Sequence, residues 1–295
     1  MSSQVLGGAK KEKFRSKFGR VANSAMCFVI AYMFIMFFFY IVTALMGKIF
    51  GFEAHVYYYG VRFELGRHTW NRVNVFFIWG FGTFFTAVLG GLFSYLFSKY
   101  KERMILVNVF LLWGAVICFS MVSAQGFLPC LQPGEYVSPF YQNLSVVFAW
   151  MFVPVPILYI LGLLFAVFLA FFSIYSSKPF LSLSYSFSKV NKKSRKQKYF
   201  FETVILPYIV ASVIILTFTY NTYQLMNFIF LNVIYLGTVG LSVIVMFFVI
   251  NINDMKVDEV LRYKILQKTN TVLFVVFIMT LSFFAITYRG FYLPF

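Results

Sequence analysis

The residues best suited to chemistry gather in one short segment of the chain, 47–72. It contains both histidines of the sequence, His55 and His68, together with Glu53 and Glu64. Imidazole and carboxylate groups bind zinc and transfer protons in acid–base catalysis. Glu53 and His55 would share one face of a strand, and Glu64 and His68 would share one face of a helix. The alternative is an ordinary polar segment whose acids pair with its arginines, and we favour that interpretation.

The rest of the sequence carries no catalytic motif that we can identify. It lacks the HExxH pattern of zinc proteases, the GxSxG pattern of serine hydrolases and the GxxxxGK[S/T] loop that binds nucleotide phosphates. The three cysteines, Cys27, Cys118 and Cys130, form no CxxC pair. We therefore predict that the protein is not an enzyme and binds neither a metal nor a cofactor.

Long apolar stretches must position these residues. Hydrophobic residues make up 61% of the chain and charged residues only 12%. A membrane-spanning helix needs about 20 apolar residues, whereas barrel strands are short and alternating. The sequence therefore predicts an all-α polytopic membrane protein. We place seven charge-free and histidine-free spans at about 22–46, 73–98, 104–125, 144–176, 203–220, 225–250 and 270–288.

Charged residues lie between these spans and differ between the two sides. All but five of the 25 Lys and Arg residues lie in the N-terminal tail or in the gaps after the second, fourth and sixth spans. Cytoplasmic loops retain an excess of Lys and Arg. We therefore predict a cell-membrane protein with a cytoplasmic N-terminus and an outer C-terminus. Residues 1–21 would form a basic cytoplasmic tail, and residues 22–295 a single transmembrane domain.

The densest basic run is KVNKKSRKQK, residues 189–198. A cation near anionic lipid contributes about 1 kcal/mol. The run is typical of a solvated loop that stops translocation, and its alternative role is contact with anionic lipid or an acidic partner. The residues concerned are Lys192, Lys193, Arg195, Lys196 and Lys198. Because the positive-inside rule explains the net charge of +16, we expect no nucleic-acid partner.

The second span has a close-packing face. Gly82, Thr86, Gly90 and Ser94 recur at four-residue spacing. Small residues at this spacing let helix backbones approach closely in lipid. The partner is either another helix of this chain, which we favour, or another subunit.

The fourth span is too long for a simple crossing and contains Val153-Pro154-Val155-Pro156. Proline lacks a backbone N–H donor. Either residues 144–152 form a short interfacial or re-entrant piece before a span that begins at Pro154, or one long helix is kinked there. We favour the kink. Irregular backbone at this depth can line a cavity, and a shallow outer cavity would involve Gln125, Glu135, Pro154 and Pro156.

Polar groups within the spans are amides and hydroxyls. Such groups more often join helices by hydrogen bonds than bind a substrate. They include Asn108, Ser120, Ser123, Gln125, Asn227, Asn232, Thr280 and Ser282.

The first outer segment favours extended structure over residues 53–65, because aromatic and β-branched residues dominate it. We predict a strand or hairpin bent at Gly60. In layout, the helix, this strand segment and the glycine-rich helix of residues 22–98 resemble the core of site-2-type intramembrane metalloproteases. The first span has neither His nor Glu, so the metal motif of that family has no match. The resemblance implies an inactive relative.

Three functions follow as expectations. The first is a non-catalytic integral membrane subunit or scaffold, which docks other membrane subunits or a second copy through the small-residue face of the second span and the outer segments. The second is a carrier or channel for a neutral or lipid-like solute near the Pro154/Pro156 break. The third is the inactive protease relative.

Overall fold

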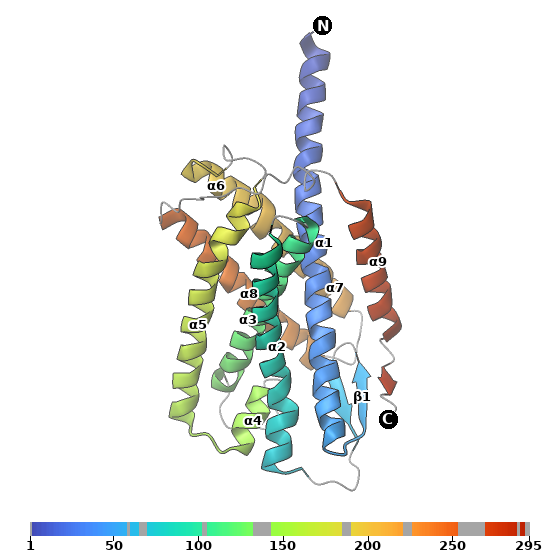
Figure 1. Cartoon of the computed structure of the whole chain (residues 1–295), viewed down its shortest axis with the longest axis vertical. Coiled ribbons are helices and arrows are strands. Elements are labelled where there is room, and N and C mark those ends of the chain that lie inside the picture. Colours follow the sequence, from blue (N-terminus) through green and yellow to red (C-terminus); the bar gives the residue numbers. More distant parts are fainter. Residues whose placement is uncertain are drawn as a thin grey trace.

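The computed structural model describes residues 2–57, 60–64, 70–101, 105–131, 143–184, 190–220, 226–252, 269–287 and 290–292. It is an all-α bundle with a small sheet at one end (Figure 1). The helices are α1 (Ser2–Ile49), α2 (Arg72–Tyr100), α3 (Ile105–Leu131), α4 (Leu144–Trp150), α5 (Val155–Ser182), α6 (Lys193–Phe200), α7 (Leu206–Tyr220), α8 (Met226–Ile252) and α9 (Thr271–Ile286). A single π-helical turn, η2 (Phe201–Ile205), joins α6 to α7.

Six helical segments among the described residues are long and apolar enough to cross a membrane. The chain is therefore an integral multi-pass membrane protein. These segments are Lys17–Ile49, Arg72–Tyr100, Leu106–Leu131, Val155–Ser182, Lys193–Thr219 and Ile229–Ile252. The seventh predicted span, 270–288, corresponds to the shorter apolar helix α9.

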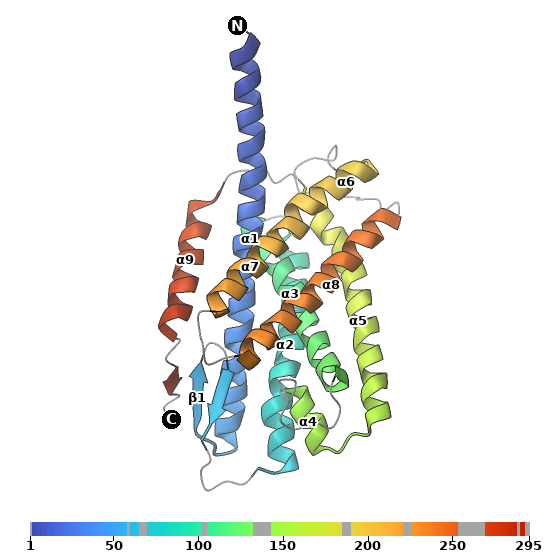
Figure 2. The ribbon, with the colours of Figure 1, turned by 180° about the vertical axis from the view of Figure 1, so that it is seen from behind.

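Helix α3 lies at the centre of the bundle, in contact with α1, α2, α5 and α8. Its Trp113 is fully buried, and the Phe28 and Phe180 rings of α1 and α5 meet it edge to face. Such pairs contribute about 0.5–1.5 kcal/mol beyond their buried area. Helices α7 and α8 run obliquely across the other side of the bundle (Figure 2).

The sheet joins the segment 47–72 to residues 291–292 near the end of the chain. β1 (Ala54–Tyr57) and β2 (Gly60–Phe63) form an antiparallel hairpin, and β3 (Phe291–Tyr292) pairs antiparallel with β1. The strand order is β2-β1-β3. The hairpin predicted over 53–65 is confirmed, whereas β3 was not predicted. Ala54 and Val56 are buried, so β1 covers one end of α1.

The single span predicted over 144–176 is wrong, and so is the kinked helix that we favoured. Helix α4 ends at Trp150, and α5 begins at Val155 as a separate helix. Phe152 has a φ of 54°, a left-handed conformation that ends a helix. Pro154 is the N-cap and Pro156 lies in the first turn of α5, where proline needs no helical hydrogen-bond donor.

Three other boundaries differ from the sequence prediction. Helix α1 begins at Ser2 and includes the basic tail. Helix α3 continues to Leu131, with Pro129 inside it. The basic run 193–198 is helical and continues into η2 and α7, rather than forming a loop.

Candidate functional site

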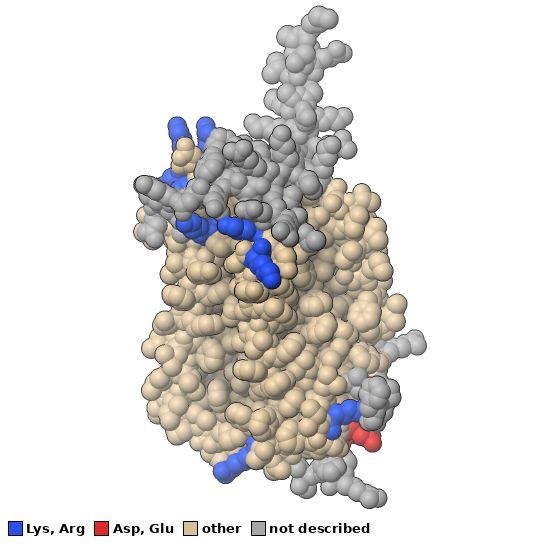
Figure 3. All heavy atoms as spheres, viewed as in Figure 1, with Lys and Arg blue, Asp and Glu red and all other residues tan. Residues whose placement is uncertain are grey.

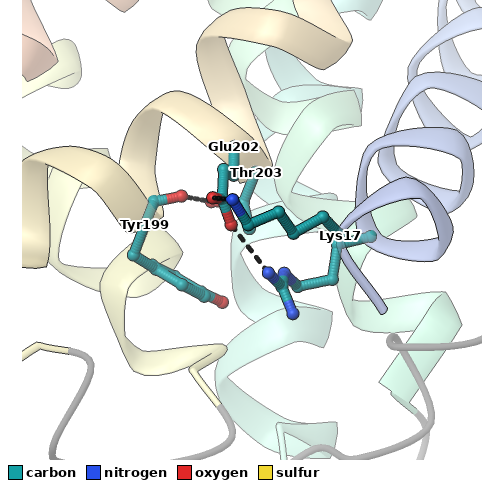
Figure 4. Close-up of polar contacts among 5 residues, drawn as sticks. Lys17, Tyr199, Glu202 and Thr203 are labelled. Carbon is teal, nitrogen blue, oxygen red and sulfur yellow. Dashed lines mark hydrogen bonds and ion pairs between the residues drawn. The ribbon is translucent and has the colours of Figure 1, made fainter. Parts of the chain in front are cut away.

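Two groups of polar side chains join helices that are distant in the sequence. The first, the ionic cluster, consists of Lys17 and Arg20 of α1 and Glu202 of η2. Arg20 Nη2 donates to Glu202 Oε2 at 2.6 Å, and Lys17 Nζ lies 3.5 Å from Glu202 Oε1 (Figure 4). The Arg20 and Glu202 side chains are 8% and 14% exposed, whereas Lys17 is 40% exposed. The Arg20–Glu202 pair is therefore the nearly buried part of the cluster.

The π-helical turn positions Glu202 beside a second set of hydrogen bonds. Thr203 accepts a hydrogen bond at its carbonyl oxygen from Ser24 Oγ, at 2.7 Å. Trp113 Nε1 donates to the same Ser24 oxygen at 2.9 Å. Thr203 Oγ1 in turn donates to the Tyr199 carbonyl at 2.8 Å (Figure 4). Single π-helical turns often occur at functional sites. This one connects α6 to α7 and contacts α1 through Ser24, which also accepts the hydrogen bond from Trp113 of α3.

The second group, the amide–tyrosine cluster, is uncharged and buried. Its members come from α1, α2, α3, α8 and the residue before α4: Tyr32, Tyr40, Thr83, Gln125, Asn143, Asn232 and Tyr235. Thr83 Oγ1 donates to Gln125 Oε1, and the Tyr32 hydroxyl donates to Asn232 Oδ1. Asn143 Nδ2 donates to the Tyr235 hydroxyl at 3.1 Å.

Two polar atoms in this cluster have no hydrogen-bond partner among the described residues, Gln125 Nε2 and the Tyr40 hydroxyl. Gln125 is fully buried, and Tyr40 is 6% exposed. Asn143 also has a φ of 52°, and backbone strain of this kind often occurs at functional sites. The cluster is therefore one place in the described part of the chain where buried polar groups from several helices meet.

The small-residue face of α2 packs against the chain's own helices. A Cβ at Gly82 would lie 2.7 Å from Thr43 Oγ1 of α1, and a Cβ at Gly90 would lie 2.9 Å from Cys118 Cβ of α3. Thr86 is buried and Ser94 half-buried, and each donates to the carbonyl four residues earlier. The contacts at Gly82 and Gly90 are therefore with other helices of the same chain.

The predicted cavity residues do not meet in one place. Gln125 is buried against Thr83 of α2, whereas Pro154 and Pro156 are exposed at the start of α5. Glu135 lies outside the described residues.

The basic residues of α6 lie at one end of the bundle, where Lys and Arg side chains gather (Figure 3). Lys192, Lys193, Arg195 and Lys198 are exposed, but Lys196 is 6% exposed. Four of the five predicted contact residues can therefore reach lipid or a partner.

Among its described residues, the segment 47–72 holds one pair of side chains suited to proton transfer or metal binding. His55 Nε2 lies 3.0 Å from Glu64 Oε1, on the exposed side of the sheet. Glu53 is also exposed, and His68 lies outside the described residues. Within the described ranges, no group of three or more His, Cys, Asp and Glu residues could hold a metal ion.

Comparison with known proteins adds no identification. No protein-family model matches the chain, and neither a curated protein nor a solved structure does. Inferences about function therefore come from the residues and their geometry.

The Arg20–Glu202 pair is the main feature that sequence reasoning missed. Its two residues are 182 positions apart, so no local pattern connects them. One signal was present: Glu202 is the only acid in a long basic segment of the chain. A lone carboxylate among cations is a candidate for a specific ion pair.

Proposed function

We propose that the protein is a non-catalytic integral membrane subunit, a scaffold that holds partner proteins in a larger membrane complex. The placement of its polar groups carries this proposal. Within the described spans, the polar clusters tie the chain's own helices together. The exposed cations of α6 and the exposed ionic groups of the sheet lie at opposite ends of the body. We therefore place the contacts with partner proteins at the two ends of the helical body.

Seven crossings, with a cytoplasmic N-terminus and an outer C-terminus, are part of this proposal. The contacts of α9 support a seventh crossing. Asn270 N, at the start of α9, donates to Asn23 Oδ1 of α1 at 3.0 Å, and β3 pairs with β1 beyond the other end. Helix α9 alone spans about 24 Å. The hydrocarbon core of a bilayer is about 30 Å thick, so residues that flank α9 would complete the crossing. The excess of cations beside α6 supports the orientation.

The outward face of the sheet is the docking surface in this proposal. His55 and Arg62 are directly opposite each other across β1 and β2, so their side chains share one face. Glu64 adds a negative charge bound to His55. Such a mixed-charge surface suits an outer segment of another membrane protein that carries charges of both signs. At the other end, the exposed cations of α6 contact anionic lipid.

Affinity purification of the tagged full chain in mild detergent tests the docking surface. We expect a stoichiometric membrane protein to co-purify, and to be lost when Arg62→Glu and Glu64→Lys are combined. Lys178→Glu is the matched control, because it changes an exposed charge at the opposite end of the body. Equal partner recovery from the double variant and the control would contradict docking through the sheet.

A carrier for a neutral or lipid-like solute is the second candidate. The buried Gln125 amide and Tyr40 hydroxyl favour it, because neither Gln125 Nε2 nor the Tyr40 hydroxyl has a partner among the described residues. Solute uptake and lipid scrambling in reconstituted vesicles test it. Activity that is lost in Gln125→Leu, but kept in the lipid-facing variant Leu163→Ala, would replace the scaffold proposal.

The inactive protease relative stays a prediction. The order of helix, hairpin and glycine-containing helix is present in α1, β1–β2 and α2. No solved structure matches the chain, so only this order of elements supports the relation.

A further inference from the structure

A groove of about 430 Å³ lies between α1 and α9. Its walls are apolar, with Phe34 and Phe38 on α1 and Val276 and Phe283 on α9. The lining also includes Thr280, but the Thr280 hydroxyl donates to the Val276 carbonyl at 2.8 Å. The groove therefore suits hydrocarbon rather than a polar ligand.

The position of the groove along the membrane normal follows from two contacts between its walls, one at each end. At one end, Asn270 N donates to Asn23 of α1. At the other end, β3 pairs with β1. The groove lies between these two contacts, within the apolar span Lys17–Ile49 of α1. Figure 1 shows α9 at the edge of the bundle, beside α1. In a bilayer, that edge faces acyl chains.

We propose that this groove binds one acyl chain of a membrane phospholipid. The groove is continuous with the exposed apolar surface of α9, where Val272 and Met279 face outward, so lipid reaches it without crossing a polar barrier. A whole transmembrane helix cannot lie within the groove, because one helical turn about 10 Å across and 5.4 Å high already occupies about 420 Å³. A flexible chain fills such a space, which lies in the range of about 300–1,000 Å³ of small-ligand sites. The site is independent of the scaffold function.

Photolabelling of the full chain tests this site. The protein is reconstituted in phosphatidylcholine vesicles that contain a trace of phospholipid with a photoreactive diazirine in mid-chain. After illumination, labelled peptides are identified by mass spectrometry. We expect label on 30–38 and 276–284 in excess of the label around Leu163 and Val167 of α5, which are 67% and 60% exposed.

A groove-filling variant completes the test. In Val276→Trp, the groove label should fall to the level at α5, whereas the lipid-facing control Leu163→Trp should keep it. Both variants are compared by size exclusion. If Val276→Trp does not fold, the ratio of groove label to α5 label on the wild-type protein decides. Equal labelling of the groove and α5 would overturn the proposal, and so would protein–protein cross-links between α9 and a second helix.

Discussion

The ionic cluster and the amide–tyrosine cluster both join helices distant in the sequence, but they differ in charge and in depth. The first holds a nearly buried Arg20–Glu202 pair beside the basic end of the bundle. The second is neutral, fully within the helical body, and contains unpartnered polar atoms among its described residues. A buried charge that loses its partner is costly, whereas neutral interhelical hydrogen bonds in membranes contribute little. We therefore expect that disrupting the ionic cluster lowers the free energy of unfolding more than disrupting the amide–tyrosine cluster.

The largest effect is expected from removing one member of the ion pair. Arg20→Ala leaves the nearly buried Glu202 carboxylate with only the more exposed Lys17 beside it, at 3.5 Å. We expect the free energy of unfolding to fall by up to about 3–5 kcal/mol. Denaturant unfolding in detergent micelles measures this change. Lys17→Ala should cost less than about 1 kcal/mol, because Lys17 is 40% exposed. Equal losses in the two variants would remove the distinction between the buried and the exposed cation.

An apolar replacement of the whole pair sharpens this point. Arg20→Met combined with Glu202→Leu leaves no buried charge, so most of the stability lost in Arg20→Ala should return. The same unfolding measurement shows the recovery. A double variant as unstable as Arg20→Ala would mean that the charges themselves, rather than the absence of an unpaired charge, stabilise the bundle.

Overpacking of α2 should have an intermediate effect. Gly82 precedes Thr83 of the neutral cluster, and a side chain at Gly82 would collide with Phe39 and Thr43 of α1. Gly82→Leu should therefore cost about 1–3 kcal/mol, measured by thermal unfolding. Gly91→Leu is the matched control, because a Cβ at Gly91 meets nothing within 4 Å. An unchanged melting temperature in Gly82→Leu would mean that the amide–tyrosine cluster does not depend on the close approach of α1 and α2.

The smallest effect is expected within the amide–tyrosine cluster. Gln125→Leu removes the acceptor of Thr83 and also removes the unpartnered Nε2 atom. Interhelical hydrogen bonds in membrane proteins average about 0.6 kcal/mol and reach about 1.7 kcal/mol, so the loss should lie within that range. A loss comparable to that of Arg20→Ala would reverse the ranking of the two clusters.

The two clusters also differ in how far the sequence predicts them. The long charge-free stretches, such as 225–250, define α8 to within two residues, because lipid requires continuous apolar helix. Gln125 and Asn232 were identified as interhelical hydrogen-bonding groups, which their contacts with Thr83 and Tyr32 confirm. Their partners could not be named, because tertiary packing decides which faces meet.

Other features depend on contacts between distant parts of the chain. The two-residue strand β3 exists only because β1 pairs with it, so no periodicity marks it. The separation of α4 from α5 depends on the φ of Phe152, which the adjacent prolines suggest but do not determine. The Arg20–Glu202 pair depends on the packing of α1 against η2 and α7.

The mass of the particle in mild detergent tests the scaffold proposal most directly. Native mass spectrometry of the wild-type chain should give the mass of a complex with a second protein or with further copies of this chain. The sheet variant Arg62→Glu with Glu64→Lys should give the 34.3 kDa mass of the single chain. A wild-type protein that is already a single folded chain of 34.3 kDa, under conditions that preserve other membrane complexes, would contradict the proposal.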